Sequence, residues 1–207
     1  MALIKLNDRA VKDATEFGSI TSLGSMTFIK KLTASSSATL SFVDGSDGVV
    51  LDDTYKEYVF TFNNIHPATD NVDFTFNGST DSGSNYNVVK TTTFFNASHY
   101  ESDISTEFAY KTGDDLAQST AYQSLTRTNL GNDNDQSLSG TLTLYNPSST
   151  TFVKHFMAID NHSHSVNLSL NDYVAGYFNT TSAINAMAFK MSSGNIDAGD
   201  ICLYGIA

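Results

Sequence analysis

The sequence predicts an all-β protein, an antiparallel two-sheet sandwich of jelly-roll type with a short N-terminal arm. The 207 residues are rich in Ser, Thr, Asn and Asp, with 14 Phe, 10 Tyr and no Trp. Thr, Tyr and Phe favour pleated strands, whereas Asn, Asp, Ser and Gly favour turns. Polar and apolar residues alternate along many segments, and no 11-residue window carries the apolar stripe of a helix. An immunoglobulin-like sandwich gives the same pattern, so the strand order stays open.

The length corresponds to one domain, and the first residues differ from the rest. We expect residues 1–24 to form an anchoring arm in which Leu3, Ile4 and Leu6 contact a neighbouring subunit. Gly18 and Gly24 bracket a flexible connector. The alternative is an edge strand followed by a loop. Residues 25–207 then form the sandwich domain.

In the first half, the clearest strand is 55–62, which places Tyr58, Phe60 and Phe62 on one face. The segment 72–76 alternates in the same way. Asp44–Gly48 has the composition of a turn, and 63–68 that of a loop. The other strands expected here are 26–32, 38–43, 86–100 and 106–111.

In the second half, 114–121 is the best place for a single helical turn, and 161–165 has the composition of an exposed polar loop. Asn146-Pro147 ends a strand. We expect strands at 139–145, 151–159, 166–170, 172–178, 184–191 and 201–206.

The net charge of −11 and the presence of only two arginines argue against nucleic acid or an anionic membrane as a partner. There is neither an 18-residue apolar window nor a signal-peptide core, so we expect synthesis in a cytoplasm. Cys202 lies in an apolar run and is expected to be a small buried hydrophobic residue. As the single cysteine, it cannot form a disulfide within the chain.

Signs of catalysis are few, and we expect the protein not to be an enzyme. No Gly-x-Ser-x-Gly elbow occurs. A depolymerase stays open as an alternative, because two carboxylates from distant strands could converge in a cleft about 5–10 Å apart.

His162 and His164 are the sharpest candidates for metal binding, because residues two apart in a strand share one face. Three such pairs around a threefold axis would offer six nitrogens to iron or nickel. Asp133 and Asp135, like Asp44-Gly-Ser-Asp47, could hold calcium, although no EF-hand loop is complete. Solvated loop residues are the alternative at each position, and no other cofactor is expected.

The loops also offer groups that could bind a glycan, namely Asn85 and Tyr86 in one turn and Asn132 and Asn134 in another. Tyrosine rings stack on sugar rings, and Tyr86, Tyr100, Tyr122 and Tyr177 are candidates for this role. The absence of Trp weakens this prediction.

Several whole segments carry a family resemblance: Asn146–His155, Tyr173–Tyr177, Asn179–Asn185, Phe189–Ile196 and Leu203–Ile206. They resemble virion structural proteins, often labelled tail-fibre-like, of tailed phages of marine bacteria, particularly cyanophages. The resemblance covers most of residues 26–207 and transfers no catalytic residue.

The resemblance implies a non-enzymatic protein on the virion exterior, made in the host cytoplasm and anchored by its arm. Capsid decoration, a knob and a short fibre module are the roles expected. The partners would be other capsid or tail proteins and further copies of the chain, with a trimer favoured. The alternative is a tail-fibre module that binds a host-surface glycan.

Overall fold

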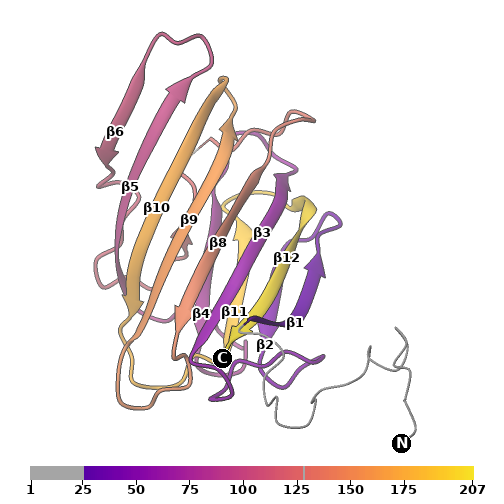
Figure 1. The fold of residues 1–207 in the computed structure, drawn as a ribbon, viewed down its shortest axis with the longest axis vertical. Helices are drawn as coiled ribbons and strands as arrows, with labels where there is room; N and C mark the ends of the chain where they lie inside the picture. The colour runs from indigo at the N-terminus through magenta and orange to yellow at the C-terminus, as the bar shows by residue number, and fades with distance from the viewer. Residues whose placement is uncertain (1–25, 128) are drawn as a thin grey trace, which may run out of the picture.

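The computed structural model describes residues 26–127 and 129–207, which form two antiparallel sheets packed face to face (Figure 1). The all-β sandwich expected from the sequence is confirmed. The larger sheet has the order β1 (Met26–Thr33), β12 (Ile196–Ile206), β3 (Glu57–Pro67), β8 (Leu138–Tyr145), β9 (Lys154–His164), β10 (Leu168–Phe178), β5 (Lys90–Tyr100), β6 (Thr106–Tyr110). The smaller sheet has the order β2 (Leu40–Val43), β11 (Ala186–Met191), β4 (Phe74–Ser79), β7 (Gln123–Ser124).

The core lies between the two sheets and is rich in phenylalanine. Tyr58, Phe60 and Phe62 point inward from β3, as their period of two predicts. Phe189 of β11 lies at the centre, with its ring 5.2 Å from that of Phe60 and 5.4 Å from that of Phe62. The rings of Phe42, Phe74 and Phe76 also surround Phe189. This aromatic cluster joins the sheets.

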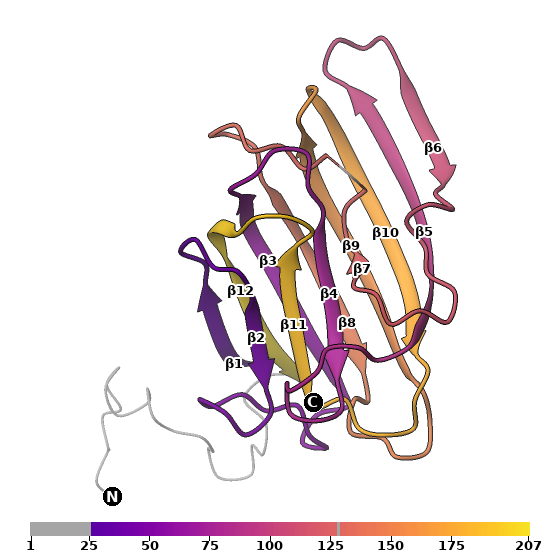
Figure 2. The ribbon, with the colours of Figure 1, turned by 180° about the vertical axis from the view of Figure 1, so that it is seen from behind.

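The sheets are unequal, and the smaller one covers only part of the larger (Figure 2). Over β9 and β10, cover comes from the segment that follows β7. It pairs with Val72 and with His164 through Leu130, and the Leu125 N–H donates to the Phe74 carbonyl. We call the described residues 125–127 and 129–130 the cover segment.

Four local predictions are wrong. Residues 114–121 contain no helical turn, because the backbones of Leu116 and Ser119 bond to β5 instead. The expected loop 63–68 is mostly strand, since β3 continues through an irregularity between Phe62 and Ile65. Residues 161–164 belong to β9, and the expected strands 166–170 and 172–178 form the single strand β10.

Cys202 is buried, as expected. The arm predicted for residues 1–24, with Leu3, Ile4 and Leu6, lies outside the described residues. Within the described residues, no helix has the length and apolar character needed to span a membrane.

Candidate functional site

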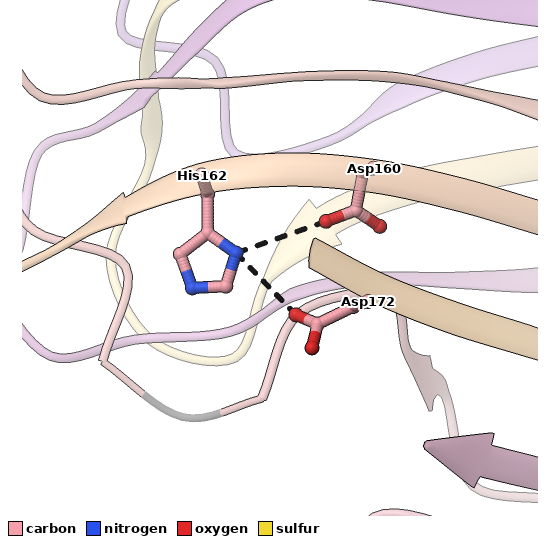
Figure 3. Close-up of side chains that lie close together, drawn as sticks. All are labelled: Asp160, His162 and Asp172. Carbon is pink, nitrogen blue, oxygen red and sulfur yellow. Dashed lines mark ion pairs between the residues drawn. The ribbon is translucent and has the colours of Figure 1, made fainter. Parts of the chain in front are cut away.

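Three ionisable side chains meet inside the sandwich: Asp160 and His162 of β9 and Asp172 of β10 (Figure 3). All three are buried. On β9 they continue the inward-facing series begun by Phe156 and Ala158, since side chains two apart share a face. Asp172 lies directly opposite Asp160 in the β9–β10 register. Strand geometry therefore brings three polar groups to one place in an otherwise apolar layer.

The imidazole points toward both carboxylates. His162 Nδ1 lies 3.3 Å from Asp172 Oδ2 and 3.7 Å from Asp160 Oδ1. One ligand atom from each residue lies within 4.8 Å of those of the other two. Five polar atoms of the cluster have no hydrogen-bond partner: both oxygens of Asp160, both ring nitrogens of His162 and Asp172 Oδ1. Buried polar groups are normally paired, so this cluster is exceptional.

Neighbouring strands shape the space around the cluster. Asn96 of β5 lies opposite Asp172, is fully buried, and has an amide whose oxygen and nitrogen lack partners. Gly140 of β8 lies opposite Asp160 and presents no side chain there. From the cover segment, the backbone N–H of Arg127 donates to Asp172 Oδ2 over 3.0 Å. The cluster thus lies on β9 and β10 and is bounded by β5, β8 and the cover segment.

Burial disfavours charge on each of the three groups. It raises the pKa of Asp172 to about 7, although the hydrogen bond from Arg127 N–H opposes the rise. Burial, together with the neighbouring Asp172, raises the pKa of Asp160 well above its ordinary value. Burial also lowers the pKa of His162 to about 3. In the absence of a cation, the charged forms of all three side chains are therefore disfavoured.

One imidazole nitrogen and two or more carboxylate oxygens form a donor set that suits divalent metal ions. The fully buried carboxylates are beyond the reach of a polymeric substrate, which would need an open cleft. Among the described residues, this is the only group of three or more His, Cys, Asp or Glu side chains that could hold a metal.

The predicted pair His162 and His164 does share the inward face of β9, but the structure assigns the two residues different surroundings. His164 is half-buried, and its Nδ1 accepts a hydrogen bond from the Val166 N–H. It lines a hollow of about 460 Å³ together with Glu107, Arg127 and Leu170. His162 meets aspartates instead of its histidine neighbour.

The two acidic loops do not gather metal ligands in the described structure. Asp133 and Asp135 are exposed, and the Gln136 N–H bonds to the Asp133 carbonyl in a tight turn. Asp44 accepts a hydrogen bond from the Leu51 N–H, while Asp47 pairs with Lys30. These aspartates therefore lie in turns and loops, where Asp is common for backbone reasons, as in the alternative that the sequence leaves open.

The predicted glycan-binding loops lie at opposite ends of β4. Asn132 donates its N–H to Asp70, in the loop that leads into β4. Asn134, in the same turn, lines a polar hollow of about 470 Å³ with His66 and Asp197. Asn85 bonds to Asp81 in the loop that leaves β4, where the Tyr86 carbonyl accepts from Asn77. The two pairs of residues therefore do not form one site.

A second feature lies on the outer face of the larger sheet, the side that Figure 1 presents to the viewer. Among the outward-facing residues of β5, β6, β8, β9 and β10, none is Asp, Glu, Lys or Arg. One continuous row across these strands consists of Tyr110, Phe95, Tyr173, Ile159 and Thr141. We call this surface the uncharged outer face.

Aromatic side chains pack against one another on the uncharged outer face. The rings of Phe95 and Tyr173 stack with centroids 4.8 Å apart and planes within 3°. Phe108 packs its ring against Phe95 at 5.7 Å and is still 74% exposed. Met157 and Ile159 are 54% and 46% exposed. Large exposed apolar patches are, in general, characteristic of interaction surfaces.

Sequence reasoning missed Asp160 and Asp172, because carboxylates are seldom fully buried. The signal available in the sequence was the alternation along the strand, because Asp160 and His162 continue the every-second-residue series of Phe156 and Ala158. The comparisons with known proteins add no further assignment: no protein-family model matches this chain, and no curated protein or solved structure does so.

Proposed function

We propose that this chain is a non-enzymatic structural protein of the exterior of a tailed-phage virion and acts as a homo-oligomer. The observation that carries the proposal is the uncharged outer face. Its stacked Phe95 and Tyr173 and exposed Phe108 offer apolar area to a partner surface. Capsid decoration, a knob and a short fibre module all require such a surface.

The charge of the whole chain favours a second copy as the occupant of this face. Two chains that each carry a net charge of −11 repel each other over most of their surfaces. Five adjacent strands without an outward Asp, Glu, Lys or Arg provide the area where two copies approach at the lowest electrostatic cost. Closed rings with a threefold axis are one of the symmetries open to such an assembly, and a trimer is our first choice.

Two further observations support the proposal. The resemblance of most of residues 26–207 to cyanophage virion proteins favours a particle surface and supplies no catalytic residue. The carboxylates that the fold brings together, Asp160 and Asp172, are buried and therefore unsuited to hydrolysis of a polymer.

Immunogold labelling of intact phage particles with antibody against the purified chain tests the location. Gold spread over the head is the result for a decoration protein, and gold confined to the tail is the result for a fibre or knob. Unlabelled particles, in a preparation where antibody against a major capsid protein does label, would contradict the virion role.

A host-glycan-binding tail module is the second candidate, and one observation favours it. Tyr145, His155 and Tyr177 line a mostly apolar hollow of about 440 Å³ on the uncharged outer face, with the His155 and Tyr177 rings 6.0 Å apart. Aromatic rings around a shallow hollow are suited to stacking on sugars.

A glycan array probed with the labelled chain, beside a Tyr177→Ala variant, separates the two candidates. Glycan binding that the variant loses would support the receptor-binding role. An oligomer that forms through this face and binds no glycan would support the structural role.

A further inference from the structure

We propose that Asp160, His162 and Asp172 bind one divalent transition-metal ion inside the sandwich, and that zinc is the metal that fits best. The proposal concerns the isolated chain and is independent of the virion role. It starts from the five buried polar atoms of the cluster that have no hydrogen-bond partner. A buried polar atom left unpaired is destabilising, so several in one place call for a ligand.

Two of the separations between ligand atoms are close to those of tetrahedral coordination. Zinc binds imidazole nitrogen and carboxylate oxygen at about 2.0–2.2 Å, which places the corners of a tetrahedron about 3.3–3.6 Å apart. His162 Nδ1 lies 3.3 Å from Asp172 Oδ2 and 3.7 Å from Asp160 Oδ1. Small side-chain adjustments therefore suffice to bind the ion.

Asn96 is the candidate for the fourth ligand. Its side chain is fully buried on the same inner face and lies opposite Asp172 in the register. The amide oxygen has no hydrogen-bond partner, so it is free to coordinate. Three strands, β5, β9 and β10, would then be joined through one ion.

Charge balance also favours a dication. Two carboxylates and a neutral imidazole carry a charge of −2, which a divalent ion neutralises within the apolar interior. Calcium prefers six to eight oxygen ligands, and magnesium retains several waters, so neither suits a compact site with an imidazole. The donor set favours zinc, with cobalt, nickel, iron and manganese as substitutes.

A nearby hollow and an outer contact are present as well. Leu170 lies opposite His162 in the register and also lines the hollow of about 460 Å³, so a direct neighbour of the cluster borders this hollow. The Arg127 N–H bonds to Asp172 Oδ2 and orients that carboxylate, as outer contacts in metal sites do. The ion would thereby fix the cover segment against β10.

The test uses the untagged full-length chain, because a histidine tag binds zinc itself. Elemental analysis of the purified protein should find about one zinc, or another transition metal, per chain. After removal of the metal by a chelator and dialysis, zinc at about 100 times its dissociation constant should raise the Tm by about 5–10 °C. Cobalt added to the stripped chain should give the intense visible bands of tetrahedral coordination.

His162→Gln and Asp172→Asn should abolish both the zinc-dependent rise in Tm and the cobalt bands. His155→Gln is the matched control for metal binding, since His155 lies on the exposed face of the same strand, and it should retain the zinc-dependent rise in Tm and the cobalt bands. His164→Gln tests the neighbouring histidine and should also retain the metal.

Two results with the wild type alone would overturn the proposal. In the first, the stripped chain shows no zinc-dependent rise in Tm and no cobalt bands. In the second, metal binding saturates only at millimolar zinc. A zinc effect that persists in folded His162→Gln and Asp172→Asn would place the ion elsewhere. If these variants do not fold, the cobalt spectrum of the wild type decides, because octahedral surface sites give only weak bands.

Discussion

Gly140 of β8 lies directly opposite Asp160 of β9, and a Cβ added at Gly140 would lie 2.4 Å from the Asp160 Cβ and 2.6 Å from its Cα. Because backbone atoms are among these contacts, the strands would have to separate. We predict that Gly140→Ala lowers the free energy of unfolding by about 1–3 kcal/mol. Gly113→Ala, at a site with open space, is the control. Urea unfolding compares the two variants, and equal stabilities would contradict the prediction.

We predict that a charge placed within the uncharged outer face prevents the association that we propose for it. Ile159 lies in the row with Tyr173 and Phe95, so Ile159→Lys buries an unpaired ammonium in any interface formed there. We expect the variant to be monomeric at concentrations where the wild type is oligomeric, with an unchanged Tm for the monomer. Light scattering coupled to gel filtration measures the mass.

Ser193→Lys, in the exposed turn between β11 and β12, adds the same charge on a different surface and should leave the oligomer intact. A wild-type chain that is monomeric at all concentrations would contradict the homo-oligomer, and an oligomer that survives Ile159→Lys would move the interface to another face.

Stability should rise with pH above neutrality because of Lys90. Its ammonium is buried beside Phe178 and bonds to the carbonyls of Val88 and Ala121, and burial lowers its pKa to about 7. In the unfolded chain the lysine keeps its proton up to about pH 10.4. The unfolded state thus binds more protons between these pH values, and the free energy of unfolding increases with pH.

Lys90→Met removes this titration and should flatten the slope between pH 7.5 and 9.5, by at most about 1.4 kcal/mol per pH unit. Urea unfolding of both chains at several pH values within that window measures the difference. Parallel slopes for the two chains would show that Lys90 stays protonated in the folded state.

Phe189 should be among the most sensitive positions of the core, because its ring contacts aromatic rings from β2, β3 and β4. Phe189→Ala should cost about 3–5 kcal/mol of unfolding free energy. Phe152→Ala, at a position 69% exposed, should change it by less than about 0.5 kcal/mol. Chemical unfolding followed by circular dichroism measures both variants.

The sequence predicts the sandwich well where alternation is clear and poorly where polar residues face inward. The segment that contains Tyr58, Phe60 and Phe62 is readily predicted as a strand, because every second residue is large and apolar. The end of β9 has the same period, but its inward positions are Asp160 and His162, so composition favours a loop. In β10 the two expected strands, 166–170 and 172–178, are separated only by Asn171, which faces outward, and Asp172 falls within an expected strand without being recognised as a buried carboxylate.

The site could not be assembled from the sequence, because the contact between Asp160 and Asp172 depends on the register of two strands. That register follows from the tight turn between His164 and Leu168, which composition does not specify to the residue. That His162 and His164 share one face of β9, by contrast, follows from the two-residue period of a strand alone. The local period of a segment predicts which side chains share a face, whereas the residues that meet across two strands can be identified only once the fold is known.

The uncharged outer face has a consequence for the response of an assembly to salt. Attraction between apolar surfaces is not screened by ions, whereas the mutual repulsion of two chains with a net charge of −11 is screened over a Debye length of about 10 Å at 0.1 M and 3 Å at 1 M ionic strength. Association through this face therefore strengthens as ionic strength rises, and an assembly built on it is most stable at high salt concentration.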